Sequence, residues 1–279
     1  MVVMTLAVVA VWVLVPRSTV LFEADGAFGP VRVLERPDGL RELYIGEGRS
    51  RQSAAYPDDP MQLVLDYTRV AMIGPALVAD NARVLIVGLG GGVMPSYLAR
   101  VRPRMELEAV EIDPVVVRAA REQFGLREGP GLIVHVADGR GFIEEAEPGR
   151  WDLIVLDAFS DTDIPRALAT QEFLHAVRDA LAAGGVVVSN VPTSPPEYPA
   201  MVATYRAVFG AVQRMRVAGR LQHILIAAAD SSAVATARLA RAASEWPSPD
   251  SVGYDLRDLV PDALVTEAPP AAAPLRDGG

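Results

Sequence analysis

Glycine and acidic residues follow several apolar runs of the chain, and their types and spacing could bind a nucleoside and move a proton. The first group is Gly88-Leu89-Gly90-Gly91-Gly92, at the end of the apolar run that begins at Arg83. Glycines permit positive φ angles and let a ligand lie against the backbone at the start of a helix. A tight turn without a ligand explains the same residues, so both interpretations stay open.

The next apolar run ends in Glu111-Ile112-Asp113. In dinucleotide-type folds an acidic residue follows the glycine turn at about this spacing and binds the ribose hydroxyls. Glu111 is therefore a candidate nucleoside ligand, and a solvated strand end is the alternative. Asp113 precedes Pro114, a pair that predicts the N-cap and the first turn of a helix.

Asp138 stands at the end of the third such run. Its carboxylate could accept a hydrogen bond from the exocyclic amine of an adenine, with Ile112 or Phe142 against the ring. The adjacent Gly139 belongs to the same expected nucleoside site. The alternative is that Asp138 caps a following helix.

Asp157, Asp161 and Asp163 cluster at the end of the fourth run. Three carboxylates over one crevice are more than a helix cap requires. One of them could take a proton from an amine or hold an ammonium ion. A solvated acidic loop is the alternative.

The runs that precede these residues predict the sheet that must position them. Apolar runs alternate with amphipathic segments, which predicts an α/β fold with a doubly wound, mostly parallel sheet covered by helices on both faces. The carboxyl ends of such strands form the crevice in which ligands bind. Residues 211–217 and 221–229 lie close together and predict an antiparallel hairpin at the sheet edge, which is typical of methyltransferase-type sheets.

The pattern divides the chain into five segments. Residues 1–16 are almost all apolar but shorter than the roughly 20 residues that span a bilayer, so a membrane anchor, a remnant of a larger membrane region and a buried strand are the alternatives. Short strands between glycines and prolines predict a small β domain over residues 17–58, and helical spacing predicts a linking helix within 59–80. Residues 81–230 form the expected Rossmann-like catalytic domain. Residues 231–279 are a C-terminal extension, whose low-complexity tail from Pro269 is expected to be disordered.

Composition excludes several kinds of chemistry. The 26 basic residues are all Arg, so no Lys is present to form a Schiff base, and the absence of Cys excludes thiolate catalysis and disulfides. The three His residues are widely spaced, and we expect no metal site. A formal net charge of −9 argues against nucleic acid as a partner. No phosphate-binding loop with Lys is present, so phosphoryl transfer from ATP is not supported.

Several of these motifs together resemble the spermidine synthase (polyamine aminopropyltransferase) family, and most of all its divergent spermidine synthase-like branch, which is often attached to membrane helices. They are VLIVGLGGG, EIDPVVVRAAREQF, ADGRGFI and WDLIVLDAFSDTDIP, and the likeness runs from about residue 21 to residue 228. The resemblance implies a small N-terminal β domain on a Rossmann-like methyltransferase domain. It also implies decarboxylated S-adenosylmethionine as co-substrate, a small-molecule amine as acceptor, and a homo-oligomer. The expected location is the cytoplasm, either free or with membrane attachment through residues 1–16.

The resemblance also assigns roles to individual residues. By resemblance Glu111 would hold the ribose, Asp138 the adenine amine, and Asp157 would be the base that deprotonates the attacking amine. Gln52 resembles a family glutamine that lines the donor site. The expected donor-binding set is Gly88, Gly90, Gly91, Glu111, Ile112, Asp138, Gly139 and Gln52, and the expected catalytic set is Asp157, Asp161 and Asp163.

The chain departs from the family pattern at three places. Gly91 stands where the family has an Asp that binds the ammonium of the donor, and without that acid the carboxylate of intact S-adenosylmethionine could lie at the helix start. The family's Tyr-His-Glu stretch resembles residues 67–69, where Arg69 replaces the acid on the acceptor side. The family's second Asp is displaced by one residue to Asp161, and Asp163 is its possible substitute.

Three functions compete on this pattern. The best supported is aminopropyl transfer from decarboxylated S-adenosylmethionine to an amine in polyamine biosynthesis. The alternative is methyl transfer from intact S-adenosylmethionine, which needs the same adenosine site. A third hypothesis is a non-catalytic nucleoside-binding or membrane-attached domain.

Overall fold

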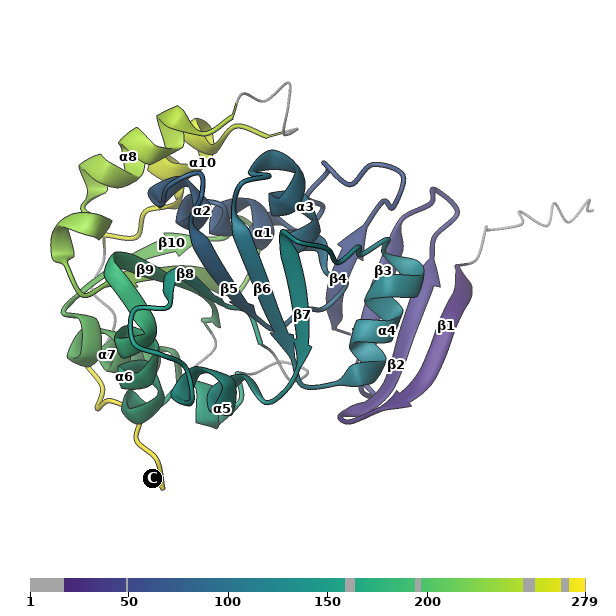
Figure 1. The fold of residues 1–279 in the computed structure, drawn as a ribbon, viewed down its shortest axis with the longest axis horizontal. Coiled ribbons are helices and arrows are strands. Elements are labelled where there is room, and N and C mark those ends of the chain that lie inside the picture. Colours follow the sequence, from purple (N-terminus) through teal and green to yellow (C-terminus); the bar gives the residue numbers. More distant parts are fainter. Residues whose placement is uncertain are drawn as a thin grey trace, which may run out of the picture.

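The computed structural model describes residues 18–48, 50–158, 164–193, 197–247, 254–266 and 271–278. Two β-sheets organise them, a four-stranded sheet at the N-terminal end and a seven-stranded sheet in the middle of the molecule (Figure 1). The apolar segment 1–16, Asp161 and Asp163 lie outside the described residues. Among the residues that are described, no helix is long and apolar enough to cross a bilayer.

The N-terminal sheet is antiparallel, and its strands follow one another in chain order. Alternate side chains share one face, and the buried Val31, Val33 and Leu43 pack there against helix α4 (Pro114–Gln123). The sequence predicts three strands in this region. The structure adds a fourth strand, RQSAA. The sequence did not predict it because its apolar and polar residues do not alternate. The strands are β1 (Thr19–Gly26), β2 (Gly29–Glu35), β3 (Arg41–Ile45) and β4 (Arg51–Ala55).

Two short helices replace the single linking helix that the sequence predicts. Helix α1 (Asp66–Ala71) and helix α2 (Ile73–Leu77) are separated at Met72. Pro75 accounts for the break, because a proline lacks an N–H and its ring clashes with the carbonyl group four residues earlier. Helix α1 is therefore a separate element, held by packing of its buried residues on the core.

The seven-stranded sheet has the doubly wound, mostly parallel arrangement that the sequence predicts. Its strand order is β10-β11-β9-β8-β5-β6-β7, and β7, β6, β5, β8 and β9 run parallel. Strands β10 and β11 form the predicted antiparallel hairpin, with β11 inserted between β10 and β9. The bounds are β5 (Arg83–Val87), β6 (Glu106–Glu111), β7 (Leu132–Val136), β8 (Trp151–Leu156), β9 (Leu181–Pro192), β10 (Ala211–Arg216) and β11 (Gln222–Ala228).

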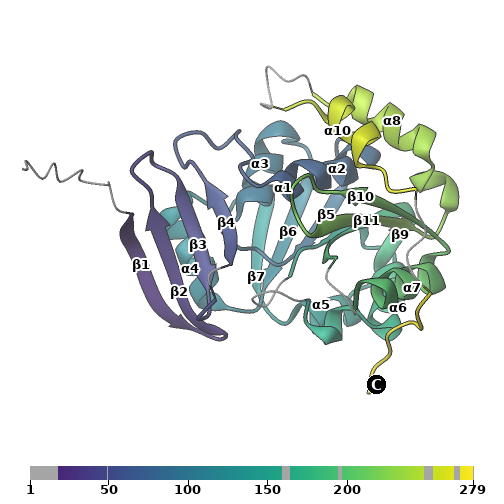
Figure 2. The same cartoon turned by 180° about the vertical axis from the view of Figure 1, so that it is seen from behind.

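Helices cover both faces of this sheet, and the side chains of its central strands are therefore buried on both sides. Val84 and Ile86 face α1, α2, α3, α8 and α10, whereas Leu85 and Val87 face α5, α6 and α7. Helices α8 and α10 belong to the C-terminal extension and lie beside α2 and α1 (Figure 2). The remaining bounds are α3 (Val93–Val101), α5 (Gly139–Glu144), η1 (Arg166–Leu168), α6 (Gln171–Ala180), α7 (Glu197–Phe209), η2 (Ser231–Val234), α8 (Thr236–Glu245) and α10 (Leu256–Ala263).

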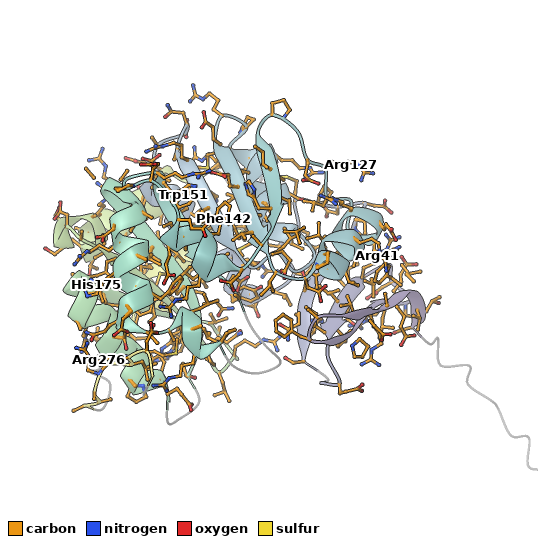
Figure 3. The ribbon with its side chains drawn as sticks, turned by 60° about the horizontal axis from the view of Figure 1, so that its bottom comes forward. Arg41, Arg127, Phe142, Trp151, His175 and Arg276 are labelled. Atoms are coloured by element: carbon orange, nitrogen blue, oxygen red, sulfur yellow. The ribbon has the colours of Figure 1, made fainter. Side chains whose placement is uncertain are left out.

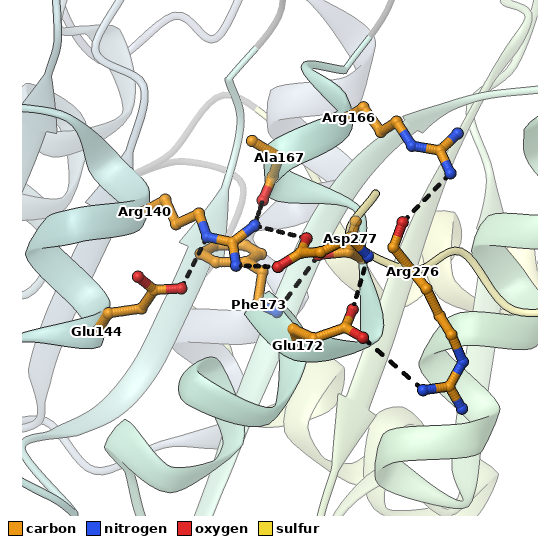
Figure 4. A network of polar contacts seen from close by, with 9 residues as sticks. Arg140, Glu144, Arg166, Ala167, Glu172, Phe173, Arg276 and Asp277 are labelled. Carbon is orange, nitrogen blue, oxygen red and sulfur yellow. Dashed lines mark hydrogen bonds and ion pairs between the residues drawn. The ribbon is translucent and has the colours of Figure 1, made fainter. Parts of the chain in front are cut away.

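The described part of the C-terminal tail, residues 271–278, differs from the predicted disorder. Leu275 exchanges two backbone hydrogen bonds with its surroundings: its N–H donates to Thr204 Oγ1 at 2.8 Å, and its carbonyl accepts from the N–H of Gln171 at 2.9 Å. The Asp277 carboxylate accepts from Nη1 and Nη2 of Arg140 at 2.8 and 2.5 Å (Figure 4). The composition of the tail does not predict its ordered placement, because that placement depends on partners in α5, α6 and α7.

Asp113 joins the two sheets. Its side chain is buried, caps α4 by accepting from Val115 N at 2.8 Å, and accepts from Ala27 N in the β1–β2 turn at 2.7 Å. The predicted N-cap is thus confirmed, and the same carboxylate also fixes the N-terminal hairpin. Gly26 leaves the space for this contact, since a Cβ there would lie 2.3 Å from Asp113 Oδ2.

We expect Asp113→Ala to lower the free energy of unfolding by about 3 kcal/mol, because two N–H groups lose a charged acceptor in a buried place. Urea denaturation at neutral pH measures this loss. Asp230→Ala is the matched control, because Asp230 caps η2 through Ser232 N on the exposed surface. Equal losses in the two variants would contradict the role of Asp113 between the sheets.

Candidate active site

One cavity of about 880 Å³ lies at the carboxyl ends of the central parallel strands. Its walls come from β4, α1, the turns that follow β5, β6, β7 and β8, the end of β9, and the β10–β11 turn. This is the crevice in which a doubly wound sheet binds ligands. Of the residues proposed from the sequence, the cavity is lined by Gln52, Gly88, Gly90, Glu111, Ile112, Asp138, Gly139 and Asp157.

The glycine turn brings the ends of β5 and β8 together. Gly88 has φ 92°, and a Cβ there would lie 2.4 Å from the carbonyl oxygen of Asp157, so a side chain is excluded by both conformation and space. Gly90 has φ 53° and lines the cavity. Gly91, expected to bind the donor, does not line the cavity and instead lies against the ring of Phe124.

Glu111 is held at the end of β6 by two backbone amides. Its Oε2 accepts from Leu89 N and its Oε1 from Asp113 N, each at 3.0 Å. Burial raises the pKa of the carboxyl group, and the amide donors oppose that rise. Each carboxylate oxygen can accept more than one hydrogen bond, so acceptor capacity remains for a ligand.

Asp138 forms the helix cap that was one of its two alternatives, and its binding of an adenine amine stays a prediction. It caps α5 by accepting from Gly141 N at 2.8 Å, and its exposed side chain borders the cavity. Gly139 lets α5 approach the sheet, because a Cβ there would lie 2.6 Å from Val87 Cγ1.

Of the two residues expected against an adenine, Ile112 or Phe142, Phe142 lies away from the cavity. Its ring centroid is 4.7 Å from that of His135. It is 6.0 Å from that of Trp151, which is labelled beside it in Figure 3. The reason is its position in the first turns of α5, where the side chain turns toward the sheet core. Ile112 is 44% exposed and remains the apolar residue of that pair in the cavity wall.

Asp157 receives one hydrogen bond on each carboxylate oxygen. Tyr67 OH donates to Oδ2 and Asn190 Nδ2 donates to Oδ1, both at 3.0 Å. Loss of water around the carboxyl group raises its pKa to about 7, and the two donors hold it below the value that burial alone would cause. The pKa of Tyr67 is raised well above its usual value by burial and by the Asp157 charge, so Tyr67 stays a neutral donor.

Tyr67 and Asn190 were not among the catalytic residues proposed from the sequence. Asn190 interrupts the apolar run of β9 at its carboxyl end, next to the strand that carries Asp157. Ser189 and Asn190, the two polar residues at this strand end, were a usable signal. Tyr67 offered none from the residues themselves, because its contact with Asp157 bridges 90 positions of the chain.

Arg69 does not face the cavity, although the sequence comparison suggested that it replaces an acid there. Its Nε donates to the carbonyl of Leu63 at 2.6 Å, and its Nη1 lies 3.4 Å from Asp66 Oδ1. Asp66 does line the cavity, so this wall carries a carboxylate. Within the described residues, no group of three or more His, Asp or Glu side chains is arranged to hold a metal ion.

Comparisons with known proteins agree with these features. The family described as spermine/spermidine synthase domain matches residues 67–212. A polyamine aminopropyltransferase of Vibrio vulnificus is 32% identical over 205 residues, which are 72% of this chain and 69% of that protein. A probable spermidine synthase structure from Corynebacterium glutamicum superposes with a TM-score of 0.72 at 20% identity and covers 92% of this chain and 96% of its own.

A methyltransferase is also similar to the chain. The human methyltransferase-like protein 13, solved in complex with SAH, has a TM-score of 0.59 at 27% identity, and the match covers 69% of this chain and 92% of that one. This similarity agrees with the methyltransferase-type sheet, whereas the family match over residues 67–212 includes most of α1, strands β5 to β9 and the first two residues of β10. The chain therefore belongs to the spermine/spermidine synthase family, which confirms the resemblance carried by its motifs.

Proposed function

We propose that the protein transfers an aminopropyl group from decarboxylated S-adenosylmethionine to an amine. The observation that carries the proposal is Asp157, whose pKa of about 7 suits a base at neutral pH and whose carboxylate lies in one cavity with Glu111 and Asp138. The relatives named polyamine aminopropyltransferases support the same reaction.

The donor nucleoside would lie across the ends of β5, β6 and β7. Glu111 keeps acceptor capacity for the two ribose hydroxyls, and Asp138 can accept from the adenine amine at the cavity wall. Ile112 offers an apolar surface to the base. Gly88 and Gly90 leave the backbone open beside the ligand, and Gln52 closes the cavity from the N-terminal sheet.

Asp157 would act on the acceptor. Its carboxylate takes a proton from the ammonium form of the amine, and the freed nitrogen lone pair attacks the carbon beside the sulfonium. The bond between that carbon and sulfur breaks, and methylthioadenosine leaves. Tyr67 and Asn190 hold the carboxylate in one orientation, which keeps the attacking nitrogen in line with the reacting carbon.

A small amine is the acceptor class that this wall favours. Asp66 and Asp157 both line the cavity near α1, and two carboxylates attract a cation with more than one amino group. Homo-oligomer formation and membrane attachment through residues 1–16 stay predictions from the sequence.

Glu111→Ala should weaken the binding of methylthioadenosine about 100-fold, because two ribose hydroxyls lose a charged acceptor. Calorimetric titration measures the change. Glu106→Ala is the matched control, since Glu106 is exposed on the same strand, outside the cavity. An unchanged affinity in the Glu111 variant would remove this residue from the nucleoside site.

Asp157→Asn should keep nucleoside affinity within about twofold and lower turnover about 1,000-fold, because the amide cannot accept the proton. Release of methylthioadenosine from decarboxylated S-adenosylmethionine, with putrescine as acceptor, measures turnover. The exposed Asp179→Asn on α6 should retain full turnover. A normal rate in Asp157→Asn would rule out Asp157 as the base, and binding without turnover in the wild-type protein would favour the non-catalytic hypothesis.

The rate should also follow the titration of Asp157. At pH values below the Asp157 pKa of about 7 the carboxylate is protonated, so kcat/KM should fall about tenfold for each unit by which the pH is lowered. Above that pH, kcat/KM should be constant. Asn190→Ala removes a donor that stabilises the charged form, so the midpoint should move to higher pH. A midpoint that is the same in both proteins would show that Asn190 does not set the pKa of the base.

A further inference from the structure

Helix η1, which follows β8 in the chain, forms a wall of the cavity that has no role in the reaction proposed above. Pro165, Ala167 and Leu168 line the cavity there. The helix is three residues long, and its own backbone hydrogen bonds close single turns, from Leu168 N at 2.8 Å and from Ala169 N at 2.9 Å. Local opening of such a short helix costs little free energy unless other segments hold it.

Arg140 holds this wall from the side of the proposed adenine. It is the second residue of α5 and stands two positions after Asp138, which lines the cavity together with Gly139. Its Nη1 donates to the carbonyl group of Ala167 at 3.1 Å. The wall formed by η1 therefore lies beside the start of α5, and its position depends on where the Arg140 guanidinium is held.

Residues 271–278 hold that guanidinium in turn. Nη1 and Nη2 of Arg140 donate to the two carboxylate oxygens of Asp277 at 2.8 and 2.5 Å, and Nε donates to Glu144 Oε1 at 2.7 Å (Figure 4). Two parallel hydrogen bonds between a guanidinium and a carboxylate fix both distance and orientation. Hydrogen bonds from Arg140 lower the pKa of the Asp277 carboxyl to about 2, so the pair is charged at neutral pH.

The same segment contacts η1 directly and is itself anchored on the sheet side. Arg166 Nη2 donates to the carbonyl group of Arg276 at 3.2 Å (Figure 4). Leu275 packs on the core and exchanges backbone hydrogen bonds with α6 and α7, and Asp277 N donates to Glu172 Oε2 at 3.0 Å. The anchored backbone therefore sets the position of the Asp277 carboxylate.

The geometry of this pair separates it from most ion pairs at a protein surface. A single exposed pair contributes little, whereas a bidentate pair within a network of charges contributes more. The side chains of Arg140 and Asp277 are 21% and 43% exposed. Dissolved salt therefore still reaches the pair and weakens it by screening.

We propose that residues 271–278 form a strap that positions the η1 wall against the donor nucleoside, with Arg140 and Asp277 as its positioning residues. The strap strengthens nucleoside binding without touching the ligand. When the pair is broken, η1 moves more freely and the base loses part of its apolar contact with that wall. The inference rests on the proposed nucleoside site, which places the adenine beside Asp138 at the start of α5.

Asp277→Asn tests the strap, because the amide keeps the shape of the side chain and removes the charge that holds Arg140. Calorimetric titration of the full chain with methylthioadenosine should show about fivefold weaker binding at low salt. Raising NaCl from about 0.05 M to about 0.5 M should reduce the difference between wild type and variant to less than about twofold. Methylthioadenosine carries no charge, so screening of the ligand does not explain such a change.

Steady-state kinetics give the second measurement. In Asp277→Asn the KM for the donor should rise about fivefold, while kcat at saturating donor should stay within about twofold, because the strap does not touch the reacting atoms. Arg140→Lys keeps the positive charge but loses the paired geometry, so it should weaken methylthioadenosine at least as much. Asp255→Asn is the matched control: Asp255 pairs with Arg257 at 2.6 Å on α10, outside the cavity, and its loss should leave the affinity unchanged at both salt concentrations.

The outcomes separate the strap from the proposed function. If Asp277→Asn binds methylthioadenosine as tightly as the wild type at low salt, while Glu111→Ala weakens it, the strap is wrong and the nucleoside site stands. A loss of affinity in Asp277→Asn that high salt does not reduce would also overturn the strap, since the ion pair would not be its cause. Failure of the wild-type protein to bind methylthioadenosine would overturn both proposals.

Discussion

The arrangement of the cavity depends on a chain of hydrogen bonds through two carboxylates at the end of β6. Glu111 binds the amides of Leu89 and Asp113, and Asp113 binds the amides of Ala27 and Val115. The glycine turn, the start of α4 and the N-terminal hairpin are thereby fixed relative to one another. Because carboxylates accept from several donors at once, a few acidic residues set the positions of three separate backbone segments.

The reacting end of the cavity is controlled by a different balance. Burial favours the neutral form of Asp157, whereas Tyr67 and Asn190 favour the charged form. These two donors come from β9, the neighbour of β8 in the sheet, and from α1, which packs against β9. The nucleoside end needs a fixed carboxylate, and the acceptor end needs one that can exchange a proton, so the same residue type serves two purposes in one pocket.

Sequence periodicity predicted the parallel sheet, its edge hairpin and the acids at the strand ends, because these follow from side-chain alternation and from the position of turns. Features that depend on contacts between distant segments were missed, as for Tyr67, for β4 and for the tail contact of Asp277. The choice between Ile112 and Phe142 was left open because the spacing along α5 does not reveal which way the Phe142 side chain turns. Gly91 was expected at the donor for its place in the motif; a Cβ there would meet Phe124 and Ser53 Oγ, and its role at the donor stays a prediction.

The position of β11 between β9 and β10 has a consequence for the order of folding. Strand β10 precedes β11 in the chain, and β11 is its neighbour in the seven-stranded sheet, so β10 cannot join that sheet before β11 does. On its other side β10 makes one isolated bridge, between Met215 and Leu264. An antiparallel hairpin forms in about 1–10 μs, faster than the pairing of distant strands, so β10 and β11 would dock on β9 as a preformed unit. Since the hairpin turn and the end of β9 both line the cavity, this late step completes the pocket around Asn190.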